Sequence, residues 1–456
     1  MALPHILVLP FPAQGHVIPL MELSHRLVGS GFKITFVNTE FNHSRVVDAL
    51  SERGGEIHPM IKLVSVPDGM ESGQDRNDLA RLCESMLLVV PGRLEQLIRK
   101  INESEVDKVT WVVADQNMAF ACRVAKKMGI RTAAFWPAAS ALLALMMSIP
   151  KLIEEEVLNE DGLPLKQGVV KLSPDMPPMD TSQFSWNHTT EPKLQKLIYQ
   201  FVMNNCRATK HAEFIISNSF QELESATFEY MPDVSPIGPL IADARPDKPI
   251  GHFWAEDAAC MSWLDEQPAN SVVYVAFGSI AVLNQHQFQE IALGLELSGQ
   301  PFLWVVRPDL TNASHDAYPE GFRDRVASRG RIVDWSPQQK VLAHPSVACF
   351  VTHCGWNSTM EGVRNGVPFL CWPYFCDQFL NQSYICDEWK IGFRLTPDDS
   401  GIVSSEQIKV KVEELLGDEE LKARSSMWKE KANDSVRVGG SSYMNMNRFL
   451  NAMKEQ

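Results

Sequence analysis

The sequence predicts an α/β protein of two Rossmann-like, doubly wound domains that face a cleft. Apolar strand-like runs alternate with helical stretches in both halves of the chain, an order typical of parallel sheets with right-handed crossovers. A segment rich in proline, aspartate and glycine (236–253) separates the halves. The chain has 456 residues, 45% of them hydrophobic and 21% charged, which is enough for two or three globular domains.

The N-terminal half begins with a strand, a loop, a helix and a second strand. HILVLPF (5–11) is an apolar strand and PAQGH (12–16) reads as a loop. The helix that follows spans 17–31 and is closed by Gly31. KITFVNT (33–39) is the next strand. Further along, WVVADQNMAF (111–120) is a strand that runs into polar residues.

The C-terminal half repeats this alternation. The segments, in order, are the strand SVVYVAFGS (271–279), the helix QFQEIALGLELSG (287–299), the strand PFLWVVR (301–307), the strand VACFVTHCG (347–355), the helix STMEGVRNG (358–366) and the strand VPFLCWP (367–373). We therefore expect a first domain at 1–240, a linker at 241–254, a second domain at 255–440 and a helix at 441–456. In doubly wound sheets, ligands bind beyond the carboxyl ends of the strands.

Composition excludes several classes of partner. The net charge of −14, without a long Lys/Arg cluster, argues against nucleic acid and anionic membranes. Nine cysteines without a C-x-x-C pair argue against a disulfide framework or a zinc site, and indicate a reducing compartment. The N-terminus lacks the basic region of a signal peptide, and the apolar run at 141–150 is too short to span a bilayer. We expect a cytoplasmic monomer that needs no metal.

The stretch FVTHCGWNSTME (350–361) carries an unusual polar and aromatic mixture between a strand and a helix. Ser358 and Glu361 match a capping box, which predicts a helix that starts at Asn357 or Ser358. Such a helix start favours a phosphate, Gly355 permits close approach of the backbone, and His353 can add a donor or a positive charge. The alternative is a capped helix after a buried strand, with the neighbouring tryptophan in the core.

Three other segments add groups that suit a nucleotide ligand. Ser279 ends a strand with a hydroxyl, although a tight turn would explain it as well. Trp335 and Gln338 offer an aromatic face and an amide for a nucleobase, whereas an isolated tryptophan more often only packs. Asp377 and Gln378 offer a carboxylate and an amide for sugar hydroxyls, or simply a helix N-terminus.

These segments together carry a family resemblance. The 44 residues from Trp335 to Gln378 contain W, PQ, H, GWNS, E and DQ at a spacing that resembles, almost position for position, the donor-binding box of plant family 1 UDP-dependent glycosyltransferases. The resemblance extends to FPAQGH (11–16), NSFQELE (218–224) and GPL (238–240). It implies the GT-B fold, a UDP-sugar as donor substrate without a metal, and a C-terminal helix that packs back on the first domain.

The resemblance also implies roles for the matching residues. The implied groups are Trp335, Gln338 and Glu361 for the uridine, Ser279, His353, Gly355, Asn357 and Ser358 for the diphosphate, and Trp356, Asp377 and Gln378 for the sugar. Glu361 cannot both complete a capping box and bind ribose, and we favour ribose. Glutamine at position 378 resembles enzymes that use UDP-glucose, whereas histidine there is associated with UDP-galactose.

The implied catalytic pair is His16 and Asp115. A histidine can take a proton near neutral pH, and a carboxylate on its other nitrogen fixes the tautomer and stabilises the imidazolium. A phenolic acceptor has a pKa of about 10 and histidine about 6.5, so deprotonation before attack would cost roughly 5 kcal/mol. Proton removal should therefore accompany attack on the anomeric carbon. One in-line displacement then implies inversion and a β-glucoside.

The acceptor is predicted less directly. Phe120, Trp136 and Ser140 are candidates for its pocket, and family habit suggests a phenolic acceptor of the flavonoid or phenylpropanoid type. The sequence departs from the family at Pro137, where relatives often have threonine or serine that touches the sugar. That contact would come from Ser140 or a backbone group, or would be absent.

Three other function classes fit the sequence less well. A nicotinamide-dependent oxidoreductase would suit Rossmann-like domains, but PAQGHVIP (12–19) is not the G-x-G-x-x-G fingerprint. A non-catalytic nucleotide-sugar binding protein would not need His16 and Asp115. A hydrolase would need a G-x-S-x-G elbow, which the sequence lacks.

Overall fold

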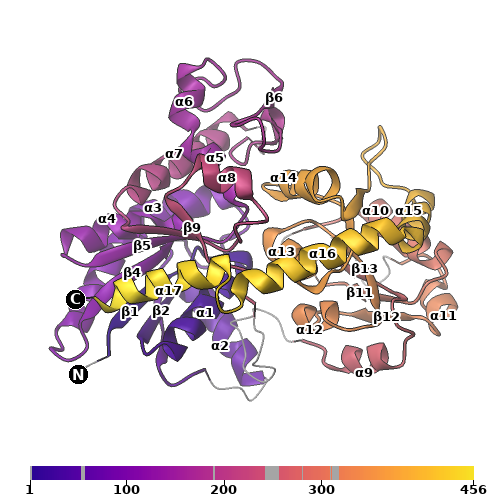
Figure 1. Cartoon of the computed structure of the whole chain (residues 1–456), viewed down its shortest axis with the longest axis horizontal. Helices are drawn as coiled ribbons and strands as arrows, with labels where there is room; N and C mark the ends of the chain where they lie inside the picture. Colours follow the sequence, from indigo (N-terminus) through magenta and orange to yellow (C-terminus); the bar gives the residue numbers. More distant parts are fainter. Residues whose placement is uncertain are drawn as a thin grey trace. The chain divides into compact units, whose positions relative to one another are not determined.

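The computed structural model describes residues 3–52, 57–187, 191–241, 256–279, 281–308, 310 and 318–455. The chain divides into two compact units, of which unit 1 comprises Met1–Trp254 and Asp434–Gln456, and unit 2 comprises Ala255–Asn433 (Figure 1). Apart from Ile241, the predicted linker lies outside the described residues. None of the helices in the described ranges is long and apolar enough to cross a membrane.

Unit 1 is built on a seven-stranded parallel sheet of order β3-β2-β1-β4-β5-β8-β9. Its strands are β1 (His5–Leu9), β2 (Lys33–Thr39), β3 (Ile61–Val66), β4 (Val109–Asp115), β5 (Arg131–Trp136), β8 (Phe214–Ser217) and β9 (Val234–Pro236). The strand order reverses between β1 and β4, so the loops after these two strands diverge at a topological switch point, where such sheets bind ligands.

Unit 1 also contains helices, some of which cover the two faces of this sheet. They are α1 (Gln14–Gly29), α2 (Glu40–Glu52), α3 (Leu79–Asn102), η1 (Gln116–Met118), α4 (Phe120–Lys127), α5 (Ser140–Met147), α6 (Ile149–Glu154), η2 (Thr181–Gln183), α7 (Pro192–Thr209), α8 (Ser225–Tyr230) and α17 (Ser441–Lys454), beside a short antiparallel hairpin of β6 (Val169–Val170) and β7 (Met179–Asp180). Alternate residues of β1 belong to two separate cores: Ile6 packs with α1 and α17, and Leu7 packs with α3 and α4.

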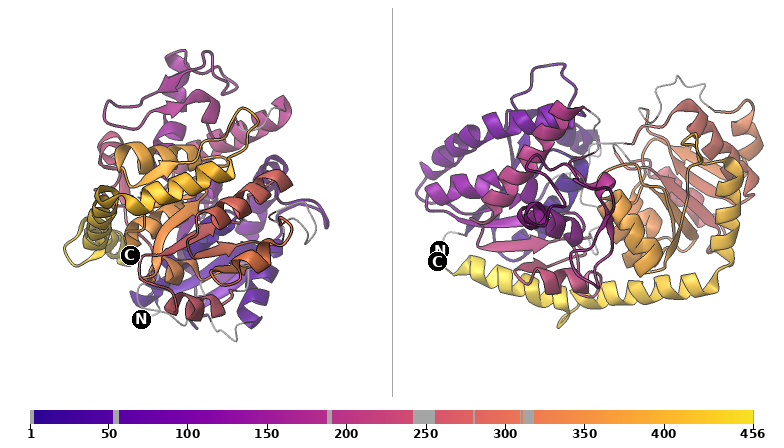
Figure 2. Two further views of the ribbon diagram at one scale, coloured as in Figure 1. Left: turned by 90° about the vertical axis from the view of Figure 1, so that its right-hand side faces the viewer. Right: turned by 90° about the horizontal axis from the view of Figure 1, so that it is seen from above.

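The C-terminal helix α17 packs on unit 1, along whose side it runs in the right-hand view of Figure 2. Phe449 meets Trp111 of β4 with ring centroids 6.4 Å apart, and the Arg131 side chain donates a hydrogen bond to the Ala452 carbonyl at 2.9 Å. Asn445 donates to the carbonyl of Pro236 in β9. These contacts give α17 an apolar and a polar attachment to the unit.

Unit 2 is built on a six-stranded parallel sheet of order β12-β11-β10-β13-β14-β15. Its elements are α9 (Ala259–Asp265), β10 (Val272–Ala276), α10 (Gln285–Leu297), β11 (Phe302–Val305), α11 (Phe322–Val326), β12 (Gly330–Val333), α12 (Gln338–Leu342), β13 (Val347–Thr352), α13 (Trp356–Asn365), β14 (Phe369–Cys371), α14 (Gln378–Ser383), η3 (Tyr384–Glu388), β15 (Gly392–Arg394), α15 (Ser405–Gly417) and α16 (Glu419–Val436), the last of which extends past the boundary between the units. The switch point lies between β10 and β13.

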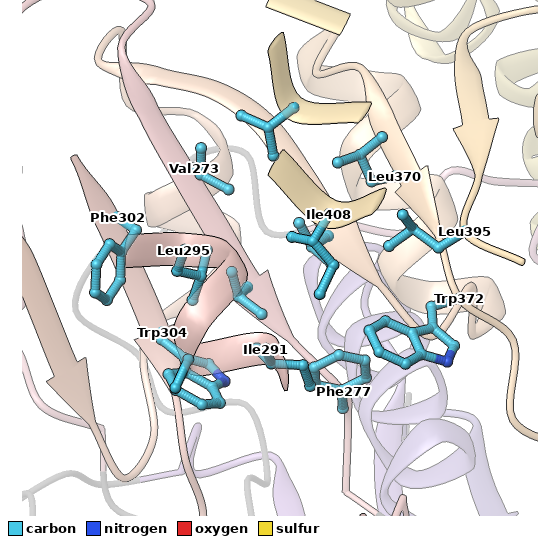
Figure 3. Packing of buried hydrophobic residues seen from close by; sticks show 14 of the residues in the cluster. Val273, Phe277, Ile291, Leu295, Phe302, Trp304, Leu370, Trp372, Leu395 and Ile408 are labelled. Atoms are coloured by element: carbon cyan, nitrogen blue, oxygen red, sulfur yellow. The ribbon is translucent and has the colours of Figure 1, made fainter. Parts of the chain in front are cut away.

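A hydrophobic core of unit 2 lies between this sheet and the helices α10 and α15. Figure 3 shows Ile291 and Leu295 of α10 and Ile408 of α15 packed against residues of the strands. Gly294 makes the close approach of the two helices possible, because a Cβ atom there would lie 2.7 Å from Cβ of Ile408. The prediction of two doubly wound parallel sheets is confirmed.

Candidate active site

His16 and Asp115 meet at the switch point of unit 1. Asp115 ends β4, and His16 follows β1, the neighbouring strand; Nδ1 of His16 lies 2.7 Å from Oδ2 of Asp115. The histidine side chain is 21% exposed and the aspartate is fully buried. The loop predicted at 12–16 is shorter than expected, because α1 begins at Gln14 and places His16 in its first turn.

The orientation of Asp115 fixes the tautomer of His16. The two carboxylate oxygens have different partners. Oδ1 accepts the backbone N–H of Asn117 at 2.9 Å, and Oδ2 contacts the imidazole of His16. A carboxylate oxygen accepts, so Nδ1 of His16 carries the proton and Nε2 keeps its lone pair. The pair is therefore arranged for Nε2 to accept a proton from another molecule.

The three residues predicted to line an acceptor pocket are buried inside unit 1. Phe120, Trp136 and Ser140 are 0%, 2% and 1% exposed. The Ser140 hydroxyl donates to Oγ of Ser217 at 3.3 Å. These side chains pack behind the strand ends, and their contact with an acceptor stays a prediction.

In unit 2, α13 begins earlier than its capping-box motif predicted. Gly355 is the N-cap and Trp356 the first helical residue, so Ser358 and Glu361 occupy the third and sixth positions of the helix. No side chain caps the helix, and the capping-box prediction is wrong. The start of α13 carries N–H groups and the positive end of the helix dipole, which suit an anion.

Glu361 is instead held by two glutamine side chains. Its Oε2 accepts Nε2 of Gln338 at 2.7 Å, and its Oε1 accepts Nε2 of Gln339 at 3.1 Å. Burial raises the pKa of Glu361 to about 7, although these two hydrogen bonds oppose the rise. The same amide of Gln338 donates to Oγ of Ser358 at 3.0 Å, and its oxygen accepts the Tyr274 hydroxyl at 3.1 Å.

The remaining residue predicted to bind the uridine, Trp335, lies close in sequence to this network. It follows β12 and is half-buried, and its carbonyl accepts the backbone N–H of Asp257 at 2.9 Å. Two residues separate Trp335 from Gln338, the first residue of α12. Trp335 is therefore partly exposed and close in sequence to the amide that orients Glu361.

His353 fits between two glycines at the switch point of unit 2. A Cβ atom at Gly278 or Gly355 would lie 2.5 or 2.4 Å from its Nε2, so neither position can carry a side chain without a shift. Gly278 also has φ +67°, a conformation that glycine adopts readily. Burial, together with the charge of Arg307, lowers the pKa of His353 to about 4. His353 is thus neutral at pH 7 and offers a hydrogen bond rather than a positive charge.

The side chain of Trp356, predicted to face the sugar, packs against other aromatic rings at the start of α13. Its side chain is 3% exposed and its ring lies 6.3 Å from that of Trp389, which stacks on Tyr384 at 5.0 Å. The indole therefore belongs to an aromatic cluster, the packing alternative raised by the sequence. Asn357, the next residue, is half-buried in the first turn of α13.

Gln378 uses one end of its amide to shape its own loop. Its Oε1 accepts the backbone N–H groups of Tyr374 and Phe375 at 2.7 and 3.0 Å. A ligand would therefore meet the Nε2 group of the amide, which donates hydrogen bonds and does not accept them. Asp377 precedes α14, and its Oδ2 accepts Nδ2 of Asn381 at 2.8 Å.

Four residues that contribute to these contacts were missed by the sequence reading: Tyr274, Arg307, Gln339 and Asn381. Tyr274 lies in the middle of β10 and Arg307 follows β11; both are buried in apolar segments, where they read as core. Asn381 is fully buried and links Asp377 to the Cys354 carbonyl, at 2.8 Å each. A buried arginine or asparagine is uncommon enough to have been a signal.

Among the residues that the structure describes, no group of three or more His, Cys, Asp or Glu side chains could hold a metal ion. The family model for UDP-glucoronosyl and UDP-glucosyl transferase matches residues 6–431. UDP-glycosyltransferase 83A1 of Arabidopsis thaliana is 42% identical over 100% of this chain and 98% of its own length. The 7-deoxyloganetin glucosyltransferase of Gardenia jasminoides is 34% identical over 98% and 97%.

A solved structure agrees with these relatives. The UDP-glucosyltransferase from Polygonum tinctorium capable of glucosylating indoxyl, in complex with 3,4-dichloroaniline, superposes with a TM-score of 0.84 at 29% identity and covers 100% of both chains. The fold is thus the GT-B fold of plant UDP-glycosyltransferases. The matches span the whole chain, including both the His16–Asp115 pair and the segment from Trp335 to Gln378. The chain belongs to the UDP-glucoronosyl and UDP-glucosyl transferase family and is a UDP-glycosyltransferase.

Proposed function

We propose that this enzyme transfers glucose from UDP-glucose to a hydroxyl group of a small acceptor and inverts the anomeric configuration, which gives a β-glucoside. Unit 1 supplies His16 as general base and Asp115 as its partner, and unit 2 supplies the groups that bind the donor. The observation that carries the proposal is the 2.7 Å contact between His16 Nδ1 and Asp115 Oδ2. It leaves Nε2 ready to take a proton.

The mechanism follows from the proton affinities of the two partners. The acceptor hydroxyl donates its proton to Nε2 of His16 while its oxygen attacks the anomeric carbon, because full deprotonation beforehand is too costly. Asp115 stabilises the imidazolium that forms. The bond between the anomeric carbon and UDP breaks as the new bond forms, and the charge that grows on the diphosphate is stabilised by the start of α13.

The donor would be held by the residues named from the family box. Trp335 would stack on uracil, and Gln338 and Glu361 would bind the nucleoside and the ribose. The diphosphate would contact Ser279, His353, Gly355, Asn357 and Ser358, and the sugar would contact Asp377, Gln378 and the backbone at Trp356. Gln378 supports glucose as the sugar, because its Nε2 is free to donate to a hydroxyl while its oxygen is engaged.

For the acceptor, we propose a planar phenol of the flavonoid or phenylpropanoid type. The relatives carry the names of different acceptors, 7-deoxyloganetin in one case and indoxyl in another. An aliphatic alcohol therefore has to be tested beside the phenols. The same base can serve both, because His16 acts on the hydroxyl proton and not on the ring.

The experiment is a panel of acceptors with UDP-glucose, UDP-galactose and UDP-xylose, read by mass spectrometry, with the anomeric configuration of the product read by NMR. We expect a β-glucoside of at least one phenol and a clear preference for UDP-glucose. An α-product, or a preference for another sugar, would contradict the corresponding part of the proposal. Binding of UDP-glucose without transfer to any acceptor would favour the non-catalytic alternative.

We further propose that the enzyme acts in the cytoplasm as a monomer. All nine cysteines are free thiols, and seven of them are buried, which supports a reducing compartment. Fluorescence microscopy of a tagged chain and size-exclusion chromatography with light scattering test the two statements. A signal confined to another compartment, or a mass of two chains, would contradict them.

A further inference from the structure

Arg307 is a buried cation behind the loop that carries Ser279. It follows β11, is 3% exposed, and donates from its two terminal nitrogens to the carbonyls of Ser279 and Ala281, the second at 2.5 Å. Ser279 and Ala281 follow β10, the strand that pairs with β11. One guanidinium thus fixes two carbonyls of the neighbouring loop with the planar fork that arginine alone provides.

The segment that contains Arg307 is itself attached to the same loop. The Arg307 carbonyl accepts the N–H of Leu310 at 3.0 Å, and the Leu310 carbonyl accepts the N–H of Leu283 at 2.8 Å. Main-chain and side-chain contacts therefore hold the loop after β10 from one side. The segment from Arg307 to Leu310 thus contacts the residues after β10 through both its main chain and the Arg307 side chain.

The charge of Arg307 acts on the phosphate end of the candidate donor site. It contributes to the lowered pKa of His353, which is neutral at pH 7. Carbonyl oxygens near a diphosphate would repel it, but those of Ser279 and Ala281 are occupied by the guanidinium. A buried positive charge is screened less by solvent than a surface one, so its effect on a nearby anion is larger.

We propose that Arg307 is a positioning residue for the diphosphate: it holds the carbonyls of Ser279 and Ala281 in place and lends this end of the site positive charge, without touching the ligand. The proposal rests on the proposed function, because it requires that UDP binds at this switch point. The proposal predicts a selective effect on binding. Loss of Arg307 should weaken ligands that carry the diphosphate and should leave ligands without it almost unchanged.

The test compares UDP with uridine, by calorimetric titration of the full chain and of Arg307→Gln. We expect the Kd of UDP to rise about tenfold or more, in line with a lost charged hydrogen bond, while the Kd of uridine changes less than about twofold. The KM for UDP-glucose should rise with it. If Arg307→Gln binds UDP as tightly as the wild type, or loses uridine equally, the proposal is wrong.

A matched control separates this role from general stability. Arg329 precedes β12, at the opposite end of the sheet, and likewise donates to carbonyls, those of Leu295, Glu296 and Gln300. Arg329→Gln should leave the UDP-to-uridine ratio unchanged. If Arg307→Gln does not fold, Arg307→Lys decides: it keeps the charge but not the fork, and should weaken UDP selectively by a smaller factor. An unchanged ratio in Arg307→Lys would then overturn the proposal. If the wild type binds no UDP at all, the proposed function fails instead.

Discussion

The side-chain amide of Gln338 lies 2.7 Å from the carboxylate of Glu361, and this contact joins two helices that follow different strands of unit 2. Gln339 donates to the other carboxylate oxygen. The carboxylate is therefore oriented before any ligand arrives. Since its pKa is raised to about 7, its charge changes within the range of pH in which the enzyme can be assayed.

This pKa predicts a pH dependence of nucleoside binding. If the ribose hydroxyls donate to Glu361, binding favours the ionised form, which dominates above pH 7 and is lost as the pH falls through about 7. The Kd of uridine should rise on acidification and approach about a tenfold rise per pH unit below that value. Titration of uridine between pH 5.5 and 8 checks this, and uridine is preferable to UDP because phosphate groups titrate near pH 6. Glu361→Gln should bind weakly at every pH; a flat profile in the wild type would contradict the role.

Tyr274→Phe tests how the orientation of Gln338 is maintained. The Tyr274 hydroxyl donates to the amide oxygen of Gln338, which turns Nε2 toward Ser358 and Glu361. Without the hydroxyl, which also contacts Oγ of Ser336 at 2.8 Å, the amide can rotate, so we expect the Kd of uridine to rise about threefold to tenfold. The ring contact with Phe350 should survive, since phenylalanine keeps the aromatic face.

The control for that variant is Tyr318→Phe, which changes a second phenol of unit 2, one that stacks on Phe322 beside α11. It should leave the affinity for uridine as in the wild type. Equal affinities for uridine in Tyr274→Phe and the wild type would mean that Gln338 is held by its other partners. Thermal unfolding of both variants shows whether a general loss of stability contributes.

The parts of this site that follow from local sequence could be predicted, and the parts that depend on contacts between residues far apart in the sequence could not. The His16–Asp115 pair follows from two strand ends, because parallel neighbouring strands bring their carboxyl ends to one edge. The start of α13 was missed because local capping preferences lost to a tertiary partner: Gln338 and Gln339, more than twenty residues away in sequence, bind Glu361. Arg307 was missed for the same reason, since nothing in its own segment indicates the carbonyls that it binds.

Substitutions in the catalytic pair should lower turnover without weakening the donor. His16→Gln removes the base, and we expect kcat to fall about 10²–10⁴-fold while the Kd of UDP changes less than about twofold. Asp115→Asn should cause a similar loss, because an amide that donates to Nδ1 forces the proton onto Nε2. Steady-state kinetics and calorimetry measure the two quantities. His25→Gln, on the same helix, is the control and should retain activity; normal turnover in His16→Gln would exclude it as the base.

Gln378→Glu separates the two ends of one side chain. The carboxylate can still accept the N–H groups of Tyr374 and Phe375, so the loop and the thermal stability should be preserved. It cannot donate, so the hydrogen bond that Nε2 would give to a sugar hydroxyl is lost. We expect the KM for UDP-glucose to rise about tenfold or more, as for a buried polar group left without its partner.

The comparison with UDP, which has no sugar, makes this prediction specific. The Kd of UDP should change less than about threefold in Gln378→Glu, whereas that of UDP-glucose should rise about tenfold or more, so that the ratio of the two reports the sugar contact alone. Gln382→Glu makes the same chemical change on α14, at a side chain that donates to the Cys371 carbonyl, and should leave this ratio as in the wild type. If both glutamate variants bind UDP-glucose as the wild type does, Gln378 shapes its loop and does not select the sugar.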